Sequence, residues 1–112
     1  MISSVLALML LAGPSPQAVV AARKEYSHCL KAYYEKALKD RPAVEAFESG
    51  LGPACAAKEQ AFRSVVVAVD TAAGVKRAAA EEGATFEVED MVTNTKELFR
   101  DATAAAAKPP SS

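Results

Sequence analysis

Hydrophobic and polar positions alternate with the period of an α-helix along most of the chain. Between residues 19 and 39, apolar side chains return every three or four positions and charged side chains occupy the opposite face. We therefore predict an amphipathic helix over residues 19–39 that buries its apolar face. The residues on that face are Val19, Ala22, Tyr26, Cys29, Leu30, Tyr33 and Ala37.

A break and a second, shorter pattern follow this helix. Pro42 disfavours helical geometry in the residue before it, but it fits the first turn of a new helix. We predict a short helix over 42–49 that buries Val44 and Phe47 and ends at the Gly-Leu-Gly sequence of residues 50–52.

The longest predicted helix covers residues 53–82, with Pro53 at its start and Gly83 as its stop signal. Apolar residues surround most of its circumference, which is typical of a central helix with neighbours on several sides. Its charged residues form one stripe, in which Asp70 is left to receive a cation from another helix or from a partner protein. The stripe consists of Glu59, Arg63, Asp70, Arg77 and Glu81.

The last predicted helix covers residues 86–102, with Thr85 as its N-cap and acidic residues in its first turns. The tail over 103–112 is rich in Ala, Pro and Ser and is predicted to be disordered. The patterns together predict an all-α domain over 19–102, a small bundle of three main helices plus one short helix. The apolar arc of the last helix contains Val88, Met91, Val92, Thr95, Leu98, Phe99 and Ala102.

The N-terminal segment has the pattern of a secretory signal. Residues 2–12, ISSVLALMLLA, are apolar and uncharged, within the ~7 to 15 residues of a signal-peptide core and short of the ~20 that span a bilayer. We predict a signal peptide over 1–18, with cleavage as late as Ala22 as the alternative, and no stable membrane span after cleavage. An uncleaved N-terminal helix packed on the domain is the competing interpretation.

Two cysteines, Cys29 and Cys55, occur in the 112 residues. An exported chain with an even cysteine count normally pairs its thiols, and both residues fall on predicted apolar faces. We predict a structural disulfide that staples the bundle and contributes roughly 3 to 4 kcal/mol in the chain-entropy estimate. A redox-active pair is disfavoured because the C-x-x-C spacing is absent.

Charge and motif content favour few chemical functions. The formal net charge of −1 with mixed signs gives no strong attraction to nucleic acid or to anionic membranes. His28 is the single histidine and projects on the polar side of its helix, which leaves metal sites, haem and catalytic triads without enough groups. We expect no cofactor, no metal and no enzymatic activity.

The apolar far side of the long helix is the best functional lead in the sequence. Val67, Ala68, Thr71 and Val75 form a candidate interaction surface for a protein partner or a homodimer, unless the first helix covers them. We expect a non-enzymatic interaction or structural module of the periplasm or cell exterior. The alternative is a carrier for a small apolar ligand, with a cavity lined by Tyr26, Tyr33, Phe62, Val66, Met91 and Phe99.

Overall fold

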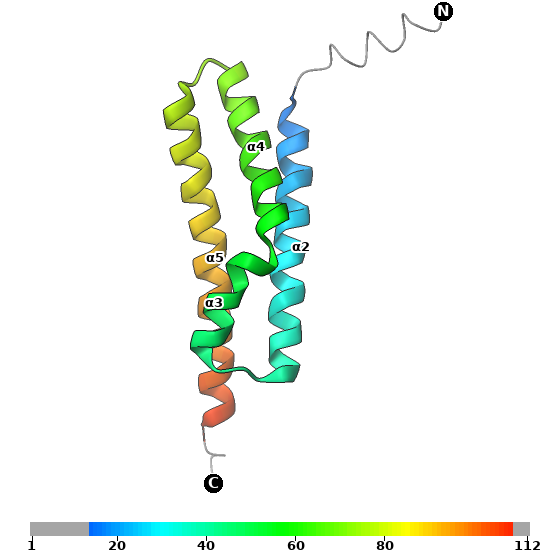
Figure 1. The fold of residues 1–112 in the computed structure, drawn as a ribbon, viewed down its shortest axis with the longest axis vertical. Helices are drawn as coiled ribbons and strands as arrows, with labels where there is room; N and C mark the ends of the chain where they lie inside the picture. The colour runs from blue at the N-terminus through cyan, green and yellow to red at the C-terminus, as the bar shows by residue number, and fades with distance from the viewer. Residues whose placement is uncertain (1–13, 109–112) are drawn as a thin grey trace, which may run out of the picture.

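The computed structural model describes residues 14–108, in which the only regular elements are four helices. They are α2 (Pro16–Asp40), α3 (Val44–Ala54), α4 (Ala56–Ala72) and α5 (Arg77–Ala107). Helix α2 runs down the molecule, α3 and α4 return in succession, and α5 runs down again beside α2 (Figure 1). The predicted small all-α bundle is therefore confirmed, with α3 and α4 together forming one bent middle element.

Helix α2 matches the first predicted helix and begins three residues earlier, at Pro16. The Ser15 hydroxyl accepts a hydrogen bond from the Ala18 amide at 3.3 Å, and Pro16 occupies the first turn, where its missing N–H costs nothing. The helix ends at Arg41, which adopts a left-handed conformation (φ 51°) and donates its N–H to the Ala37 carbonyl. The local sequence thus determines both ends.

The predicted signal peptide lies mostly outside the described residues, because residues 1–13 are not described. The predicted cleavage positions, after Ala18 or as late as Ala22, lie inside α2. Val19 and Ala22 pack against the core, so cleavage after Ala18 would leave both contacts in the mature chain.

The predicted end of the short helix is wrong. Helix α3 continues through Gly50 and Gly52 to Ala54, since Leu51 is fully buried and its packing outweighs the low helix propensity of the glycines. Pro53 lies in the last turn of α3 rather than at the start of the next helix. Proline has no N–H for the carbonyl four residues earlier, and the chain leaves helical geometry soon afterwards, at Cys55.

The predicted long helix over 53–82 is also wrong, because the chain turns at Gly74. Gly74 has φ +96°, its N–H donates to the Thr71 carbonyl at 3.1 Å, and the Val75 N–H donates to the Asp70 carbonyl at 2.9 Å. These two bonds form a Schellman motif, which ends a helix at a left-handed glycine. Gly83, the predicted stop, lies inside α5.

Helix α5 is longer at both ends than the predicted helix over 86–102. It has 31 residues, so Thr85 is an interior residue rather than an N-cap and residues 103–107 are helical rather than disordered. Both extensions are rich in alanine, which has the highest helix propensity. The tail residues 109–112 lie outside the described part of the chain.

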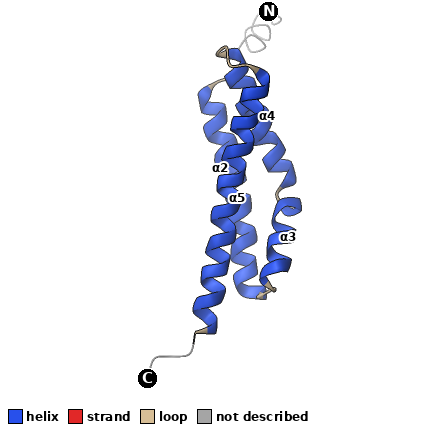
Figure 2. Ribbon diagram, turned by 90° about the vertical axis from the view of Figure 1, so that its left-hand side faces the viewer, coloured by secondary structure: helices blue, strands red, loops and turns tan. Residues whose placement is uncertain are grey.

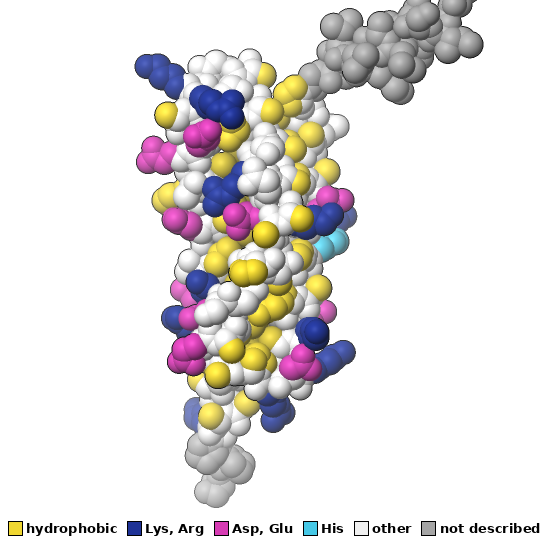
Figure 3. All heavy atoms as spheres, in the orientation of Figure 1, with side chains coloured by type: hydrophobic (Ala, Val, Ile, Leu, Met, Phe, Trp, Pro, Cys, Tyr) yellow, Lys and Arg dark blue, Asp and Glu magenta, His cyan; other side chains and the backbone are white. Residues whose placement is uncertain are grey.

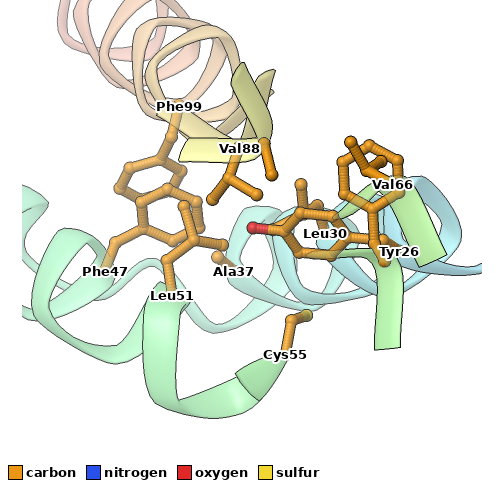
Figure 4. Close-up of a cluster of buried hydrophobic side chains, with 11 residues drawn as sticks. Tyr26, Leu30, Ala37, Phe47, Leu51, Cys55, Val66, Val88 and Phe99 are labelled. Carbon is orange, nitrogen blue, oxygen red and sulfur yellow. The ribbon is translucent and has the colours of Figure 1, made fainter. Parts of the chain in front are cut away.

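Aromatic side chains fill the interior of the bundle (Figure 4). The Phe47 and Phe99 rings stack with their centroids 4.1 Å apart, and Tyr33 packs on the other side of Phe47 at 5.1 Å. Higher in the bundle, Tyr26 lies against Phe62 with ring centroids 6.1 Å apart. These contacts join all four helices, since the five rings come from α2, α3, α4 and α5.

Candidate functional site

The predicted disulfide between Cys29 and Cys55 is confirmed, with the two Cα atoms 5.9 Å apart. Cys55 is buried at the junction of α3 and α4, and Cys29 lies halfway along α2. The disulfide therefore joins the bend between α3 and α4 to the middle of α2. It crosslinks two helices at the point where the chain leaves helical geometry, as a structural disulfide would.

The four residues of the candidate surface do not stay together. Val67, Ala68 and Thr71 lie half-buried on α4, whereas Val75 lies in the turn that follows Gly74. The Thr71 hydroxyl donates to the Val67 carbonyl at 2.8 Å, and Val67 packs against the core. Val75 is separated from the other three residues because α4 ends before the turn at Gly74 and does not continue to residue 82 as predicted.

The charged stripe is divided between two helices in the same way. Arg63 pairs with Glu59 at 3.0 Å on α4, and Arg77 pairs with Glu81 at 3.1 Å on α5, as the spacing predicts. Arg63 also donates to the Thr85 hydroxyl at 2.8 Å, which ties α4 to α5. Both arginines line a polar hollow between α4 and α5, where the acidic partners offset their charge.

Figure 3 shows positive and negative side chains interspersed over the face that carries α3 and α4. His28 is exposed on α2, as predicted. Within residues 14–108, no three His, Cys, Asp or Glu side chains gather closely enough to hold a metal ion.

The residues predicted for an apolar carrier lie in the packed interior or at its edge. Tyr26, Phe62, Val66 and Phe99 are buried, and Tyr33 and Met91 pack against them. A ligand in this place would have to separate the ring pairs of Tyr26 with Phe62 and of Phe47 with Phe99. The packing therefore gives the carrier prediction no support.

Tyr26 brings a titratable polar group into this interior. The Tyr26 hydroxyl donates to Glu59 Oε1 at 3.4 Å, while the ring is almost completely buried. Burial of the phenol, with the nearby Glu59 carboxylate as the second cause, raises the pKa of Tyr26 to about 12. The tyrosine is thus a neutral hydrogen-bond donor over the whole physiological range.

A groove runs along the seam between α2 and α5, and we call it the α2–α5 groove. It is a series of three hollows of about 300 Å³ each, two of which share Ser27 and Met91. Figure 2 shows the two helices side by side, with α3 lying to one side of the pair. The groove is lined by Arg23, Ser27, Lys31, Tyr34 and Leu38 of α2 and by Glu87, Met91, Asn94, Leu98 and Ala102 of α5.

Exposed apolar side chains gather on this side of the molecule. Leu38 is 41% exposed and Leu98 is 47% exposed, although both are large aliphatic residues. Val20, 65% exposed, lies about five turns before Leu38 on the same face of α2. Phe86, 75% exposed, lies elsewhere on α5. Exposed hydrophobic residues that line a groove mark a contact surface more strongly than scattered ones.

The two rims of the α2–α5 groove carry opposite charge. Helical spacing places Lys24, Lys31 and Glu35 on the outer edge of α2, where Lys31 pairs with Glu35 at 3.9 Å. It places Asp90, Glu97 and Asp101 on the outer edge of α5. At the head of the groove, Arg23 pairs with Glu87 across the seam at 2.8 Å. The groove therefore has an apolar floor, a basic rim on α2, on which Lys24, Lys31 and Glu35 leave a net charge of +1, and an acidic rim on α5.

Sequence reasoning missed this site because it assigned Met91 and Leu98 to a buried arc. An amphipathic pattern identifies the apolar face of a helix, but not how much of that face its neighbours cover. The one usable signal was the apolar residues Val20 and Leu38, which lie off the buried face of the first helix.

No protein-family model, curated protein or solved structure matches the chain. None of the four described helices combines the length and the apolar character that crossing a bilayer requires.

Proposed function

We propose that this protein is a small, exported, non-enzymatic interaction module that binds a helix of a partner protein in the α2–α5 groove. The observation that carries the proposal is the exposure of Leu38 and Leu98 along the seam of two parallel helices. A helix laid in such a groove completes a four-helix arrangement and buries apolar surface that now faces water.

The dimensions of the groove suit a helix. From Arg23 to Leu38 it follows about four turns of α2, or roughly 23 Å at 1.5 Å per residue. A partner segment of about 15 to 20 residues would cover this length. Its apolar side would face Tyr34, Leu38, Met91 and Leu98.

The groove is a better candidate than the α4 surface predicted from the sequence. Val67, Ala68 and Thr71 are half-buried, and Thr71 uses its hydroxyl on its own helix. Val75 is as exposed as Leu38, at 41%, but it lies apart in the turn after Gly74, whereas Leu38 and Leu98 line successive hollows along one seam. Large exposed apolar side chains in a concave site contribute most when a partner desolvates them.

Export is the second part of the proposal. The disulfide between Cys29 and Cys55 supports an oxidising compartment, and the apolar residues 2–12 support a cleaved signal. Intact-mass analysis of protein isolated from its native host, alkylated without reductant, tests both. We expect a chain that begins at Val19 and carries no alkyl group. A full-length chain with two alkyl groups would contradict export.

Site-specific photo-crosslinking in the native host tests the binding site. A photoreactive residue in place of Leu98 should give one dominant protein adduct, because that side chain points into the groove. The matched control is Glu89, an exposed residue nine positions before Leu98, which projects about 180° away on the same helix. Equal adducts from both positions, or none from Leu98, would overturn the proposed groove.

A further inference from the structure

We propose that the partner at the α2–α5 groove is a second copy of this chain, whose own α2–α5 pair packs on the groove about a two-fold axis parallel to the helices. The inference rests on the proposed function, since it names the occupant of the same groove. It is carried by the opposite charges of the two rims and by the register of α2 against α5.

The symmetry follows from the parallel direction of α2 and α5 (Figure 1). A two-fold axis along the groove places α2 of one copy against α5 of the other, twice, with all four helices parallel. The basic rim of each copy then faces the acidic rim of its mate. Such an isologous contact is self-complementary and closes after two subunits.

The alternative two-fold axis, perpendicular to the helices, gives the opposite result. It places α2 against α2 and α5 against α5, so that Lys24 and Lys31 of both copies share one side and Asp90 and Asp101 share the other. Like charges in facing positions disfavour this antiparallel dimer. The charge pattern therefore selects the parallel dimer.

The register identifies the pair that would form. Arg23 pairs with Glu87, which is 64 residues later in the chain. Ser27 and Met91, also 64 residues apart, line the same two hollows. Asp90 therefore lies at the level of residue 26, about 3 Å along the axis from Lys24. Neither side chain belongs to an ion pair within residues 14–108, so Lys24 is available to Asp90 of the second copy.

The surface that the dimer can bury is small, which favours a high dissociation constant. The face from Val20 to Leu38 is about 27 Å long and two helices wide, roughly 20 Å, so it buries on the order of 540 Å² per copy. The total of about 1,100 Å² lies at the lower limit for specific complexes. We therefore expect a weak dimer, with a dissociation constant in the micromolar range or above, that loosens as salt is raised.

Sedimentation equilibrium of the mature, oxidised protein over a range of concentrations tests the inference. We expect Lys24→Glu and Asp90→Lys each to raise the dimer dissociation constant at least about tenfold, since each places like charges in facing positions twice. The double variant K24E/D90K should return close to the wild-type value. Lys36→Glu, an exposed substitution on another face of α2, is the matched control and should leave the constant unchanged.

Two results would overturn the inference in different ways. A double variant that dimerises no better than the singles would overturn the parallel arrangement, because only facing unlike residues can exchange charge. A wild-type protein that stays monomeric at millimolar concentration would overturn the second copy as occupant. In that case a groove-specific crosslink at Leu98 to a different protein would still support the proposed function.

Discussion

The two sides of the α2–α5 pair differ in what covers them. On one side, Phe62 of α4 covers Tyr26 of α2 and Phe47 of α3 covers Phe99 of α5, and both covered side chains are at most 2% exposed. On the other side, Leu38 and Leu98 remain between two-fifths and one-half exposed. The α2–α5 pair thus has one face packed in the core and one face whose apolar side chains are partly exposed to water. The packed core and the proposed binding groove therefore lie on separate faces, so substitutions can test stability and binding separately.

The largest expected effect comes from the covered side. Phe47→Ala removes a ring that stacks on Phe99 at 4.1 Å and packs on Tyr33, so we expect a loss of about 3 to 5 kcal/mol in the free energy of unfolding. Leu98→Ala, on the open side, should cost less than about 1 kcal/mol because its side chain is already half in water. Urea unfolding followed by circular dichroism measures both.

The comparison between the two sides fails if Leu98→Ala destabilises the monomer as strongly as Phe47→Ala. Unfolding should be measured at low protein concentration, where a dimer contributes nothing.

Removal of the disulfide is the next largest change. Cys29 and Cys55 close a loop with a sequence separation of 26, for which the chain-entropy estimate is about 3.5 kcal/mol. We expect the variant C29S/C55S to unfold with a free energy lower by about that amount, and to lose mainly the order of the bend between α3 and α4. Hydrogen exchange locates the effect, and uniform protection across α3 and α4 in the variant would contradict it.

Much of this fold could be predicted from the sequence, and the wrongly predicted helix boundaries share one cause. The helical class, the first helix and the disulfide follow from periodicity, capping residues and cysteine count. The boundaries at Gly50, Gly74 and Gly83 do not, because three glycines compete for the role of helix end. Only tertiary packing decides which glycine adopts the left-handed conformation.

The candidate site was beyond prediction for a related reason. The pattern of α5 marks Met91 and Leu98 as apolar, but their exposure depends on the distance of α3 and α4 from that edge. A groove is a property of three elements together, and periodicity describes one at a time.

Gly50 tests how tightly the covered side is packed. A Cβ added at Gly50 would overlap the oxygen of the Tyr33 hydroxyl, which donates a hydrogen bond to the Phe47 carbonyl at 3.4 Å. Gly50→Ala therefore displaces a partly buried ring and breaks its hydrogen bond, and we expect a loss of about 2 kcal/mol. The double variant G50A/Y33F, which removes the clashing oxygen, should recover part of the loss in thermal unfolding.

Alkaline pH weakens the covered side through Tyr26. Its pKa is raised from 10.0 to about 12 in the folded protein, so folding favours the neutral phenol. The stabilisation is complete below pH 10 and is lost as the pH rises toward 12, with a magnitude of about 2 kcal/mol. Unfolding free energies at about pH 9 and about pH 11.5 measure the loss.

The variant Tyr26→Phe serves as the control for this loss. It should remove most of the difference between the two pH values, together with the late phase of the tyrosinate absorbance titration. A wild-type titration that is complete near pH 10 would contradict the role of Tyr26.

The smallest expected effect has the opposite sign and lies on the exposed surface of α5. A Cβ added at Gly83 would meet no atom within 4 Å, and the residue sits inside a helix, so Gly83→Ala should stabilise the fold by about 0.5 to 1 kcal/mol. Gly74→Ala also meets no neighbour, but it forces a side chain into φ +96° and should destabilise. If the helix instead ended at Gly83, as periodicity alone predicts, the two signs would be reversed. Opposite shifts of the melting temperature therefore locate the turn at Gly74 and not at Gly83.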